Sequence, residues 1–288
     1  MRHIDEETIT QAVIASLSSC PDDRLRLLMT SLVQHLHAFG REVKLTEAEW
    51  YAAIEFLTDA GHITDDKRQE FILLSDTLGM SMLVTTLNNR KPKACTETTV
   101  LGPFYVAAAP IFDNGADISQ GAKGIPCWVR GHVRDLDGHP VAGALMDIWQ
   151  SDEDGFYDVQ HADVPGPQAR ARLQTLADGG FHFRSVVATA YPIPHDGPVG
   201  KMLISTGRHP WRPAHVHFLI DAPGFERLVT QVFRSNDTFL DSDVVFGVRQ
   251  TLVANWIEHP PGTSPDGDEI STPYYTLDFD FVLNRIPS

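Results

Sequence analysis

The sequence feature that most constrains this chain is the alternation of histidine with apolar residues in Ala214–Ile220. The pattern predicts a β-strand, because successive side chains of a strand point to opposite faces. His215 and His217 would then share one face, and the alternate residues on the other face are apolar and belong in a core. Just upstream, Pro213 fixes its own φ and pushes Arg212 toward an extended backbone. Two imidazoles side by side with a guanidinium nearby are typical of a metal site. The alternative interpretation is that both histidines lie on the surface of a half-exposed strand.

Length and charge set the outer limits of what the chain can do. At 288 residues and 31.9 kDa it has enough material for one large domain or two smaller ones. Its 42% hydrophobic and 21% charged residues are ordinary for a soluble globular protein. The formal net charge of −15 argues against binding to a phosphate backbone or to an anionic membrane surface. We therefore expect no nucleic-acid or membrane partner.

The cysteines and the first residues bear on the compartment. Cys20, Cys95 and Cys127 are unclustered and odd in number, so they describe neither a disulfide framework nor a zinc site. The polar, acidic start of the chain is unlike a signal peptide, and no apolar run approaches the length of a membrane span. These features together predict a cytoplasmic protein.

Residues 1–98 carry helical periodicity. Thr8–Leu17 and Arg24–Phe39 place apolar residues at three- and four-residue spacing, which predicts amphipathic helices. Asp22 is expected to cap the second of these helices and Gly40 to end it. Further helices are expected at Thr46–Ala60, Asp65–Thr77 and Ser81–Asn88. This region has no catalytic pattern, so we expect it to serve packing or dimerisation.

The composition changes between Lys91 and Phe104, where Pro, Gly, aromatic and β-branched residues become frequent. Many short strands with turn signals between them predict an antiparallel β-sandwich over residues 99–288, which makes the whole chain α+β. Cys127–Asp135 and Val141–Gln150 are expected to pair as a hairpin around the turn at Asp137. The further strands are expected at Gly180–Val187, Ala214–Ile220, Leu228–Phe233, Gln250–Trp256 and Leu277–Leu283.

Two tyrosines lie in the loops expected between these strands. Tyr157 ends an acidic run that starts at Asp152, and Tyr191 opens a Pro-rich loop that would hold it extended. A calcium loop at Asp152 is excluded, because the required order of Asp and Gly and the flanking helices are missing. Together with His215 and His217, the tyrosines make a hard, anionic donor set that suits Fe(III) better than zinc. A free phenol has a pKa of about 10 and ionises at neutral pH only when a strong cation holds the phenolate. Such a site can bind a catechol-type diol as a chelating dianion and activate it toward O₂.

Four segments, in order along the chain, carry a resemblance to a known family: Thr99–Phe104, Asp147–Tyr157, Tyr191–Gly200 and Gly207–His217. With them the chain resembles the intradiol ring-cleavage dioxygenases, and among these the hydroxyquinol 1,2-dioxygenases most closely. The resemblance extends from the helical region to the end of the chain. It implies an Fe(3+) cofactor and a helical dimerisation domain followed by a catalytic β-sandwich.

The resemblance also implies roles for particular residues. The iron ligands would be Tyr157, Tyr191, His215 and His217. Arg212 would stabilise negative charge on the reacting ring with Gln231 close by, and Tyr191 would leave the metal as the diol binds and carry away a substrate proton. The substrate-binding residues would be Leu73, Asp76, Val100, Leu101, Gly102, Pro103, Phe104, Ile193, Pro194 and Arg212.

The implied reaction is cleavage of hydroxyquinol by O₂ to give maleylacetate. Asp76 is the only acidic residue in the implied pocket, so we expect it to accept a hydrogen bond from the third hydroxyl group. An alternative role for Asp76 is to cap the helix that follows. The resemblance further implies a homodimer, with phospholipid between the helices as a further possibility.

Three other functions are open. The first, within the same family, is a catechol 1,2-dioxygenase that gives cis,cis-muconate. The second is a cupin-type Fe(II) or Mn(II) enzyme with Asp221 as carboxylate ligand, but the only histidine left downstream is His259, in a Pro-rich turn. The third is a non-enzymatic β-sandwich binding module, which would leave the two tyrosines and Arg212 without a common purpose.

Overall fold

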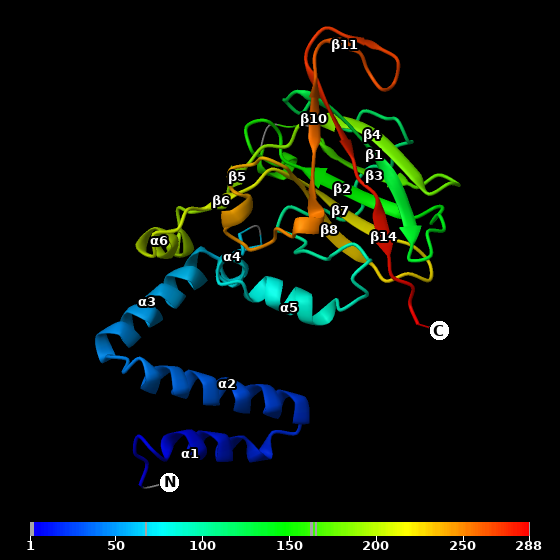
Figure 1. Ribbon diagram of the computed structural model, residues 1–288. Coiled ribbons are helices and arrows are strands. Elements are labelled where there is room, and N and C mark those ends of the chain that lie inside the picture. The colour runs from blue at the N-terminus through cyan, green and yellow to red at the C-terminus, as the bar shows by residue number, and fades with distance from the viewer. Residues whose placement is uncertain (1–2, 67, 162–163, 165, 288) are drawn as a thin grey trace. The chain divides into compact units, whose positions relative to one another are not determined.

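A computed structural model describes residues 3–66, 68–161, 164 and 166–287 (Figure 1). The chain divides into two compact units, Met1–His62 and Ile63–Ser288. The first unit is helical, and the described residues of the second contain the sheets together with three α-helices. Because the two units have no defined placement relative to one another, each is described by itself.

The first unit contains α1 (Ile9–Ser16), the 3-10 turn η1 (Leu17–Ser19), α2 (Asp23–Glu42) and α3 (Glu47–Ile63), whose last residue falls beyond the unit boundary. Asp22 caps α2 as predicted, because its side chain accepts hydrogen bonds from the backbone N–H groups of Arg24 and Leu25. Thr46 and Glu49 form the predicted capping box at α3, with Glu49 accepting from the backbone N–H of Thr46 at 2.9 Å.

The prediction that Gly40 ends α2 is wrong, since the helix continues to Glu42. A glycine inside a helix costs only about 1 kcal/mol, so it does not stop a helix by itself. The left-handed residue that ends α2 is Lys44, with φ of 52°. The backbone N–H of Leu45 bonds the carbonyl of Gly40, and that of Lys44 bonds the carbonyl of Arg41. This is a Schellman motif with lysine in the usual glycine position.

Within the first unit, α1 packs along α2. Thr10 lies 3.0 Å from Nδ1 of His37, and Arg41 donates to the carbonyl of Glu6 at 2.7 Å and to Thr10 at 2.8 Å. Although α2 is amphipathic, it buries none of its residues in the single chain. The exposed apolar side chains of α2 are Leu25, Leu27, Leu28, Met29, Leu32, Leu36 and Phe39. All of them except Leu27 lie on one side of the helix, where they form a surface that a partner could cover.

The second unit contains two five-stranded sheets. One has the order β10-β13-β1-β14, with β4 also paired to β1, and the other has the order β3-β2-β7-β8-β9. Their strands are β1 (Pro126–Asp135), β2 (Leu145–Gln150), β3 (Arg170–Gln174), β4 (Gly180–Val186), β7 (His215–Asp221), β8 (Leu228–Arg234), β9 (Val253–Ala254), β10 (Trp256–His259), β13 (Tyr274–Asp278) and β14 (Phe281–Leu283). The short pairs are β5 (Tyr191–Pro192) with β6 (Trp211–Arg212), and β11 (Gly262–Thr263) with β12 (Glu269–Ile270).

A single apolar core joins the inner faces of the two large sheets. Phe181 and Phe281 from one sheet meet Phe218 from the other, with ring centroids 4.8–6.3 Å apart. The predicted α+β class is confirmed. The sheets are mixed rather than wholly antiparallel, because β13 and β14 run parallel to β1 and β9 runs parallel to β8. Figure 1 shows the green β1 beside the red β14, a pairing between distant segments that strand patterns cannot indicate.

The predicted hairpin of β1 with β2 is wrong, because the two strands belong to different sheets. The turn does form: the backbone N–H of Asp135 bonds the carbonyl of His139, and that of Val141 bonds the carbonyl of Val133. The chain then crosses the core instead of pairing, as connections in a sandwich often do. The predicted strand Gln250–Trp256 is also wrong as one element, since it comprises η4 (Gln250–Leu252), β9 and the start of β10.

Three helices of the second unit are α4 (Glu70–Thr77), α5 (Met80–Asn88) and α6 (Pro198–Ser205). Glu70 is fully buried and accepts a hydrogen bond from the backbone N–H of Val199 in the first turn of α6 at 3.0 Å. The compact units meet at Ile63, so α4 and α5 belong to the unit of the sheets. The predicted domain boundary at residue 98 stays a prediction.

Membrane-spanning potential in the described residues is weak. No single helix in these residues is long and apolar enough to cross a membrane. The pair of α4 and α5, which is bent by 78°, would be long and apolar enough by length and composition alone. The cytoplasmic location stays a prediction.

Candidate active site and metal centre

Strand β7 places the two histidines at the centre of the site. It lies between β2 and β8, with His217 opposite Trp149 on one side and Gln231 on the other. Both histidines are about 1% exposed, which excludes a surface role. Their Nε2 atoms lie 3.1 Å apart, as expected for side chains two positions apart on a strand.

The two tyrosines reach this point from separate loops. Tyr157 follows β2, and Tyr191 lies in β5, directly opposite Arg212 in β6. Their hydroxyl oxygens lie 3.4 Å apart, and that of Tyr157 lies 3.5 Å from Nε2 of His215. The structure therefore brings together the four donor atoms that the sequence predicts.

The chemistry of this donor set fits a metal ion. Nδ1 of His215 lies 2.7 Å from the carbonyl of Pro213, so we assign the ring proton to Nδ1, which leaves the Nε2 lone pair facing the other donors. Burial, followed by the charge of Arg212, lowers the pKa of His215 to about 3. Burial, followed by the neighbouring His215, lowers the pKa of His217 well below its ordinary value. Both imidazoles are therefore neutral at pH 7, as metal ligation requires.

Tyr157, in contrast, must be ionised to act as a phenolate ligand. Burial and then the neighbouring Tyr191 raise its pKa well above the ordinary value of a phenol. Without a cation beside it Tyr157 remains protonated, so its ionisation at neutral pH requires a strong Lewis acid within bonding distance. The same burial makes such a bond strong, because water does not compete for it.

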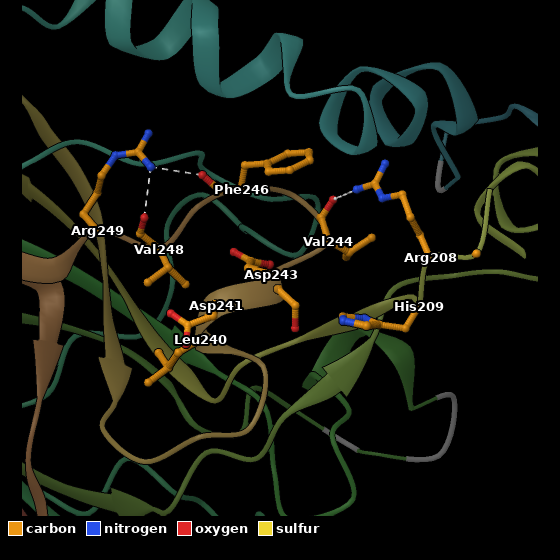
Figure 2. A pocket seen from close by; sticks show the side chains of 11 residues that line it. Arg208, His209, Leu240, Asp241, Asp243, Val244, Phe246, Val248 and Arg249 are labelled. Carbon is orange, nitrogen blue, oxygen red and sulfur yellow. Dashed lines mark hydrogen bonds between the residues drawn. The ribbon is translucent and has the colours of Figure 1, made fainter.

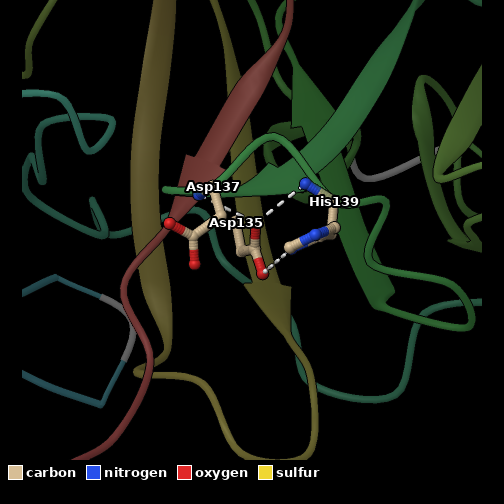
Figure 3. A group of neighbouring side chains, drawn as sticks. All are labelled: Asp135, Asp137 and His139. Atoms are coloured by element: carbon tan, nitrogen blue, oxygen red, sulfur yellow. Dashed lines mark hydrogen bonds and ion pairs between the residues drawn. The ribbon is translucent and has the colours of Figure 1, made fainter.

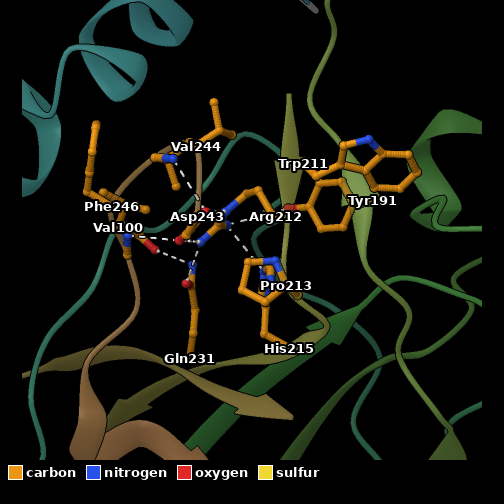
Figure 4. A network of polar contacts seen from close by, with 12 residues as sticks. Val100, Tyr191, Trp211, Arg212, Pro213, His215, Gln231, Asp243, Val244 and Phe246 are labelled. Atoms are coloured by element: carbon orange, nitrogen blue, oxygen red, sulfur yellow. Dashed lines mark hydrogen bonds and ion pairs between the residues drawn. The ribbon is translucent and has the colours of Figure 1, made fainter. Parts of the chain in front are cut away.

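Arg212 lies beside these donors in a buried polar network (Figure 4). Its Nη1 is 3.5 Å from the Tyr191 hydroxyl and 3.3 Å from Nε2 of His215. Its Nη2 donates to the side-chain oxygen of Gln231 at 2.9 Å, and Asp243 accepts from Nε and Nη2 at 3.0 and 3.2 Å. Burial alone would lower the pKa of Arg212, but Asp243 and the two tyrosines raise it above the ordinary value.

The predicted pocket residues 100–104 run past the same donors. The carbonyl of Val100 accepts from Nε2 of Gln231 at 3.1 Å. Gly102 has a φ of 79°, and a Cβ at that position would lie 3.2 Å from Cε1 of His217. The Phe104 ring stacks on Tyr157 with centroids 4.5 Å apart. Leu101 and Pro103, between these residues, are exposed.

The other predicted pocket residues lie on α4 and on the loop after β5. Leu73 packs against the apolar cluster that contains Ile193, and Pro194 follows it in the chain, partly buried. Asp76 is buried within α4 and close enough to Arg212 and Asp243 for their charges to affect it. Burial raises its pKa, while a hydrogen bond from Ser81 and the charge of Arg212 oppose the rise. The cap of α5 is Gly79, so Asp76 is not the residue at that cap.

Comparisons with known proteins place almost the whole chain in one family. Residues 100–285 match the family described as "Dioxygenase", and residues 22–96 match the "Catechol dioxygenase N terminus". The chain is 56% identical to the 6-chlorohydroxyquinol 1,2-dioxygenase of Cupriavidus pinatubonensis, with 99% of each chain covered. It is 50% identical to the hydroxyquinol 1,2-dioxygenase of Nocardioides simplex, with 96% of this chain and 95% of that protein covered.

The chain belongs to the intradiol ring-cleavage dioxygenases. The predicted family membership is therefore confirmed. A solved structure agrees: the hydroxyquinol 1,2-dioxygenase of Pseudomonas putida DLL-E4 superimposes with a TM-score of 0.92 at 44% identity, covering 98% of this chain and 99% of that one. Enzymes of this family generally depend on Fe(III).

In this intradiol dioxygenase Asp243 also lines a surface hollow of about 490 Å³ (Figure 2). Its lining includes Arg208, His209, Phe246 and Arg249. The Arg208 guanidinium sits 5.1 Å from the centre of the Phe246 ring and donates to backbone carbonyls. The four predicted iron ligands do not line this hollow.

A second group of metal-ligand types comprises Asp135, Asp137 and His139 (Figure 3). Asp135 already accepts from the backbone N–H groups of Asp137 and His139, and Arg285 pairs with it at 2.7 Å. Asp137 and His139 are exposed. The group is thus a turn stabilised by a carboxylate, with an arginine supplying the counter-charge.

Asp243 of this intradiol dioxygenase could not be predicted from the sequence. The acidic stretch around Asp241 and Asp243 has no distinguishing spacing, and the side chain acquires a function only through its contact with Arg212, 31 positions away. A buried arginine needs a carboxylate partner. The sequence therefore predicts that Arg212 has such a partner, but not which residue it is.

Proposed function

We propose that this intradiol dioxygenase cleaves hydroxyquinol (1,2,4-trihydroxybenzene) with O₂ to give maleylacetate. The observation that carries the proposal is the convergence of two buried imidazoles, two phenols and one guanidinium within 3.1–3.5 Å. Similarity over nearly the full chain to enzymes named for hydroxyquinol and 6-chlorohydroxyquinol supports the substrate class. Both atoms of O₂ enter the product, because maleylacetic acid differs from hydroxyquinol by two oxygen atoms.

The metal would be Fe(III), held by Tyr157, Tyr191, His215 and His217. The two phenolates would offset much of its charge and so favour the ferric state, and the two imidazoles would bind it as neutral donors. When bound, the ion supplies the Lewis-acid and redox chemistry by which a chelated diol reacts with O₂. The rest of the mechanism depends on the protein side chains around the ion.

Tyr191 is the residue we assign to proton removal from the substrate. It lies on the short β5–β6 pair, whereas Tyr157 is fully buried and stacked on Phe104. As a phenolate, Tyr191 would accept a proton from the hydroxyl of a diol that enters the site. Nη1 of Arg212, 3.5 Å away, stabilises negative charge at this point whether it is on the tyrosine or on the substrate.

Asp76 is the residue we assign to the third hydroxyl group of hydroxyquinol. Its carboxylate lies in the electrostatic reach of Arg212 and is buried on α4. A phenolic hydroxyl that donates to it forms a charge-assisted bond. Catechol lacks that hydroxyl and would leave the carboxylate buried without this partner.

A second copy of the chain is the partner we assign to the apolar surface of α2. An amphipathic helix that buries nothing in its own chain needs a surface to cover it. A homodimer formed through α2 satisfies this need, and a phospholipid acyl chain between the helices is a further element of the proposal.

The proposed function is tested by O₂ uptake with hydroxyquinol, 6-chlorohydroxyquinol and catechol. We expect the trihydroxylated rings to have a higher kcat/KM than catechol. A preference for catechol with cis,cis-muconate as product would move the enzyme to the catechol branch of the family. Absence of uptake with every diol by iron-loaded protein would overturn the proposal.

A further inference from the structure

The five N–H bonds of Arg212 divide into two groups (Figure 4). Nε and Nη2 point away from the tyrosines, where they donate to Asp243 and Gln231. Nη1 alone points toward the candidate metal ligands, 3.5 Å from the Tyr191 hydroxyl and 3.3 Å from Nε2 of His215. Because the guanidinium is planar, a partner that holds Nε and Nη2 also determines where Nη1 lies.

Asp243 is itself held in place. Its Oδ2 accepts from the backbone N–H of Gly247 at 2.9 Å, and its Oδ1 accepts from that of Val245 at 3.3 Å. The side chain is about 2% exposed. The carboxylate is therefore bound by backbone on one side and by the guanidinium on the other, and it has little freedom to rotate.

Gly247 provides the space for this arrangement. A Cβ at this position would lie 2.8 Å from Nη2 of Arg212, 3.1 Å from Oδ2 of Asp243 and 3.3 Å from Oε1 of Gln231. Contacts this short would force the guanidinium or the carboxylate to move. The turn that carries Asp243 thus presents one carboxylate to Arg212 and keeps the neighbouring volume empty.

We propose that Asp243 is a positioning residue, which acts on the reaction only by holding Arg212 so that Nη1 faces the Tyr191 hydroxyl. The inference rests on the proposed function, because it presupposes that Arg212 stabilises charge during diol cleavage. Asp243 contacts neither candidate metal ligands nor, in this assignment, the substrate. A buried ion pair adds little net stability compared with apolar packing, so orientation is the more specific contribution of the pair.

A double-mutant cycle on kcat tests this relationship. Arg212→Ala should lower kcat for hydroxyquinol by about 10²-fold with iron retained. Asp243→Ala should lower kcat by about tenfold or more, because a freely rotating guanidinium is misplaced for much of the time. In the Arg212→Ala background, Asp243→Ala should change kcat by less than about threefold, since nothing remains to be positioned.

The matched control is Asp147→Ala. Asp147 is also buried and bound to an arginine, with Arg172 donating at 2.7 Å, but its partner does not point toward the candidate ligands. Its loss should lower the melting temperature and leave kcat within about threefold of wild type. If Asp243→Ala does not fold, Asp243→Asn replaces it in the cycle. The amide keeps the volume of the side chain and replaces one acceptor with a donor that faces Nη2.

A second measurement does not depend on turnover. In the metal-free protein, the ¹⁵N–¹H signal of Arg212 Nε should be visible and slow to exchange with water, because Asp243 covers it. The signal is assigned by its loss in Arg212→Ala. It should vanish in Asp243→Ala and persist in Asp147→Ala.

The outcomes separate the inference from the function on which it rests. An Arg212→Ala enzyme as fast as wild type would overturn the proposed role of Arg212 and this inference with it. If Arg212→Ala is slow but the loss from Asp243→Ala is as large in its background as in wild type, Asp243 acts independently and the inference alone is wrong. An Arg212 Nε signal unchanged in Asp243→Ala would also overturn it.

Discussion

The Nε2 atoms of His215 and His217 lie 3.1 Å apart inside the protein, with the lone pair of His215 directed inward by the hydrogen bond of its Nδ1 to the Pro213 carbonyl. Two neutral imidazoles at this distance need either a shared proton or a cation between them. The Tyr157 hydroxyl lies 3.5 Å from Nε2 of His215, and a metal bound at this point would satisfy all three groups together.

Loss of either histidine should release iron. His215→Ala and His217→Ala each remove one of four donors, so iron content after purification should fall by at least about tenfold. His259→Ala is the control, because that ring bonds the Thr276 hydroxyl in the opposite sheet. Metal analysis of the purified proteins measures the effect. Full iron occupancy in both β7 variants would show that these histidines are not ligands.

The iron-loaded protein should be coloured. Phenolate bound to Fe(III) absorbs broadly in the visible range, and we expect a red to burgundy protein whose band changes in Tyr157→Phe and in Tyr191→Phe. Tyr275→Phe is the matched control, since that hydroxyl bonds Glu258 elsewhere in the unit. Absorption spectra of protein with known iron content decide the point. A colourless enzyme that is loaded and active would rule out phenolate ligation.

Asp76 should set the preference for hydroxyquinol. A hydrogen bond from the third hydroxyl to an ionised carboxylate is worth about 1.5–3 kcal/mol, or roughly ten- to a hundredfold in kcat/KM over catechol. Asp76→Ala and Asp76→Asn should remove most of this ratio, while the surface variant Asp196→Asn should keep it. Burial raises the pKa of Asp76, so the ratio should also fall on the acidic side as the carboxylate becomes protonated. An unchanged ratio in both Asp76 variants would remove this residue from the explanation.

Charges on α2 should prevent dimerisation. Leu32 and Leu36 are exposed in the single chain, and a covered leucine contributes about 1.5–3 kcal/mol. Leu32→Asp combined with Leu36→Asp should therefore shift the sedimentation coefficient from that of a dimer to that of a monomer at micromolar concentration. Gln34→Asp, on the opposite side of the same helix, is the control. A wild-type protein that sediments as an active monomer would contradict the assignment.

The placement of the site was predictable because it depends on local geometry. Alternation alone put His215 and His217 on one face of a strand, and the structure has them there. Asp22 and Thr46 likewise act as helix caps through bonds to residues two or three positions away. Tyr157 and Tyr191 needed the family motifs, because loops carry no periodic signal that would bring two distant side chains together.

What the sequence could not predict was pairing across long distances. The parallel pairing of β1 with β13 and β14 joins residues separated by about 150 positions, and the assignment of β1 and β2 to different sheets depends on it. The partner of Arg212 posed the same difficulty: several aspartates follow it, and only the folded turn shows that Asp243 is the one that contacts it. Strand propensity and charge indicate what a residue needs, but not which distant residue supplies it.

The most direct test of the central claim is the product formed from hydroxyquinol under ¹⁸O₂. Cleavage between the adjacent hydroxyl-bearing carbons predicts maleylacetate with one equivalent of O₂ consumed and ¹⁸O in both new oxygen positions. Loss of label by exchange with water is measured in a parallel reaction in H₂¹⁸O and subtracted. Mass spectrometry of the quenched reaction identifies the product and counts the label. A ring opened outside the two hydroxyl groups, or a hydroxylated ring that remains closed, would contradict the account.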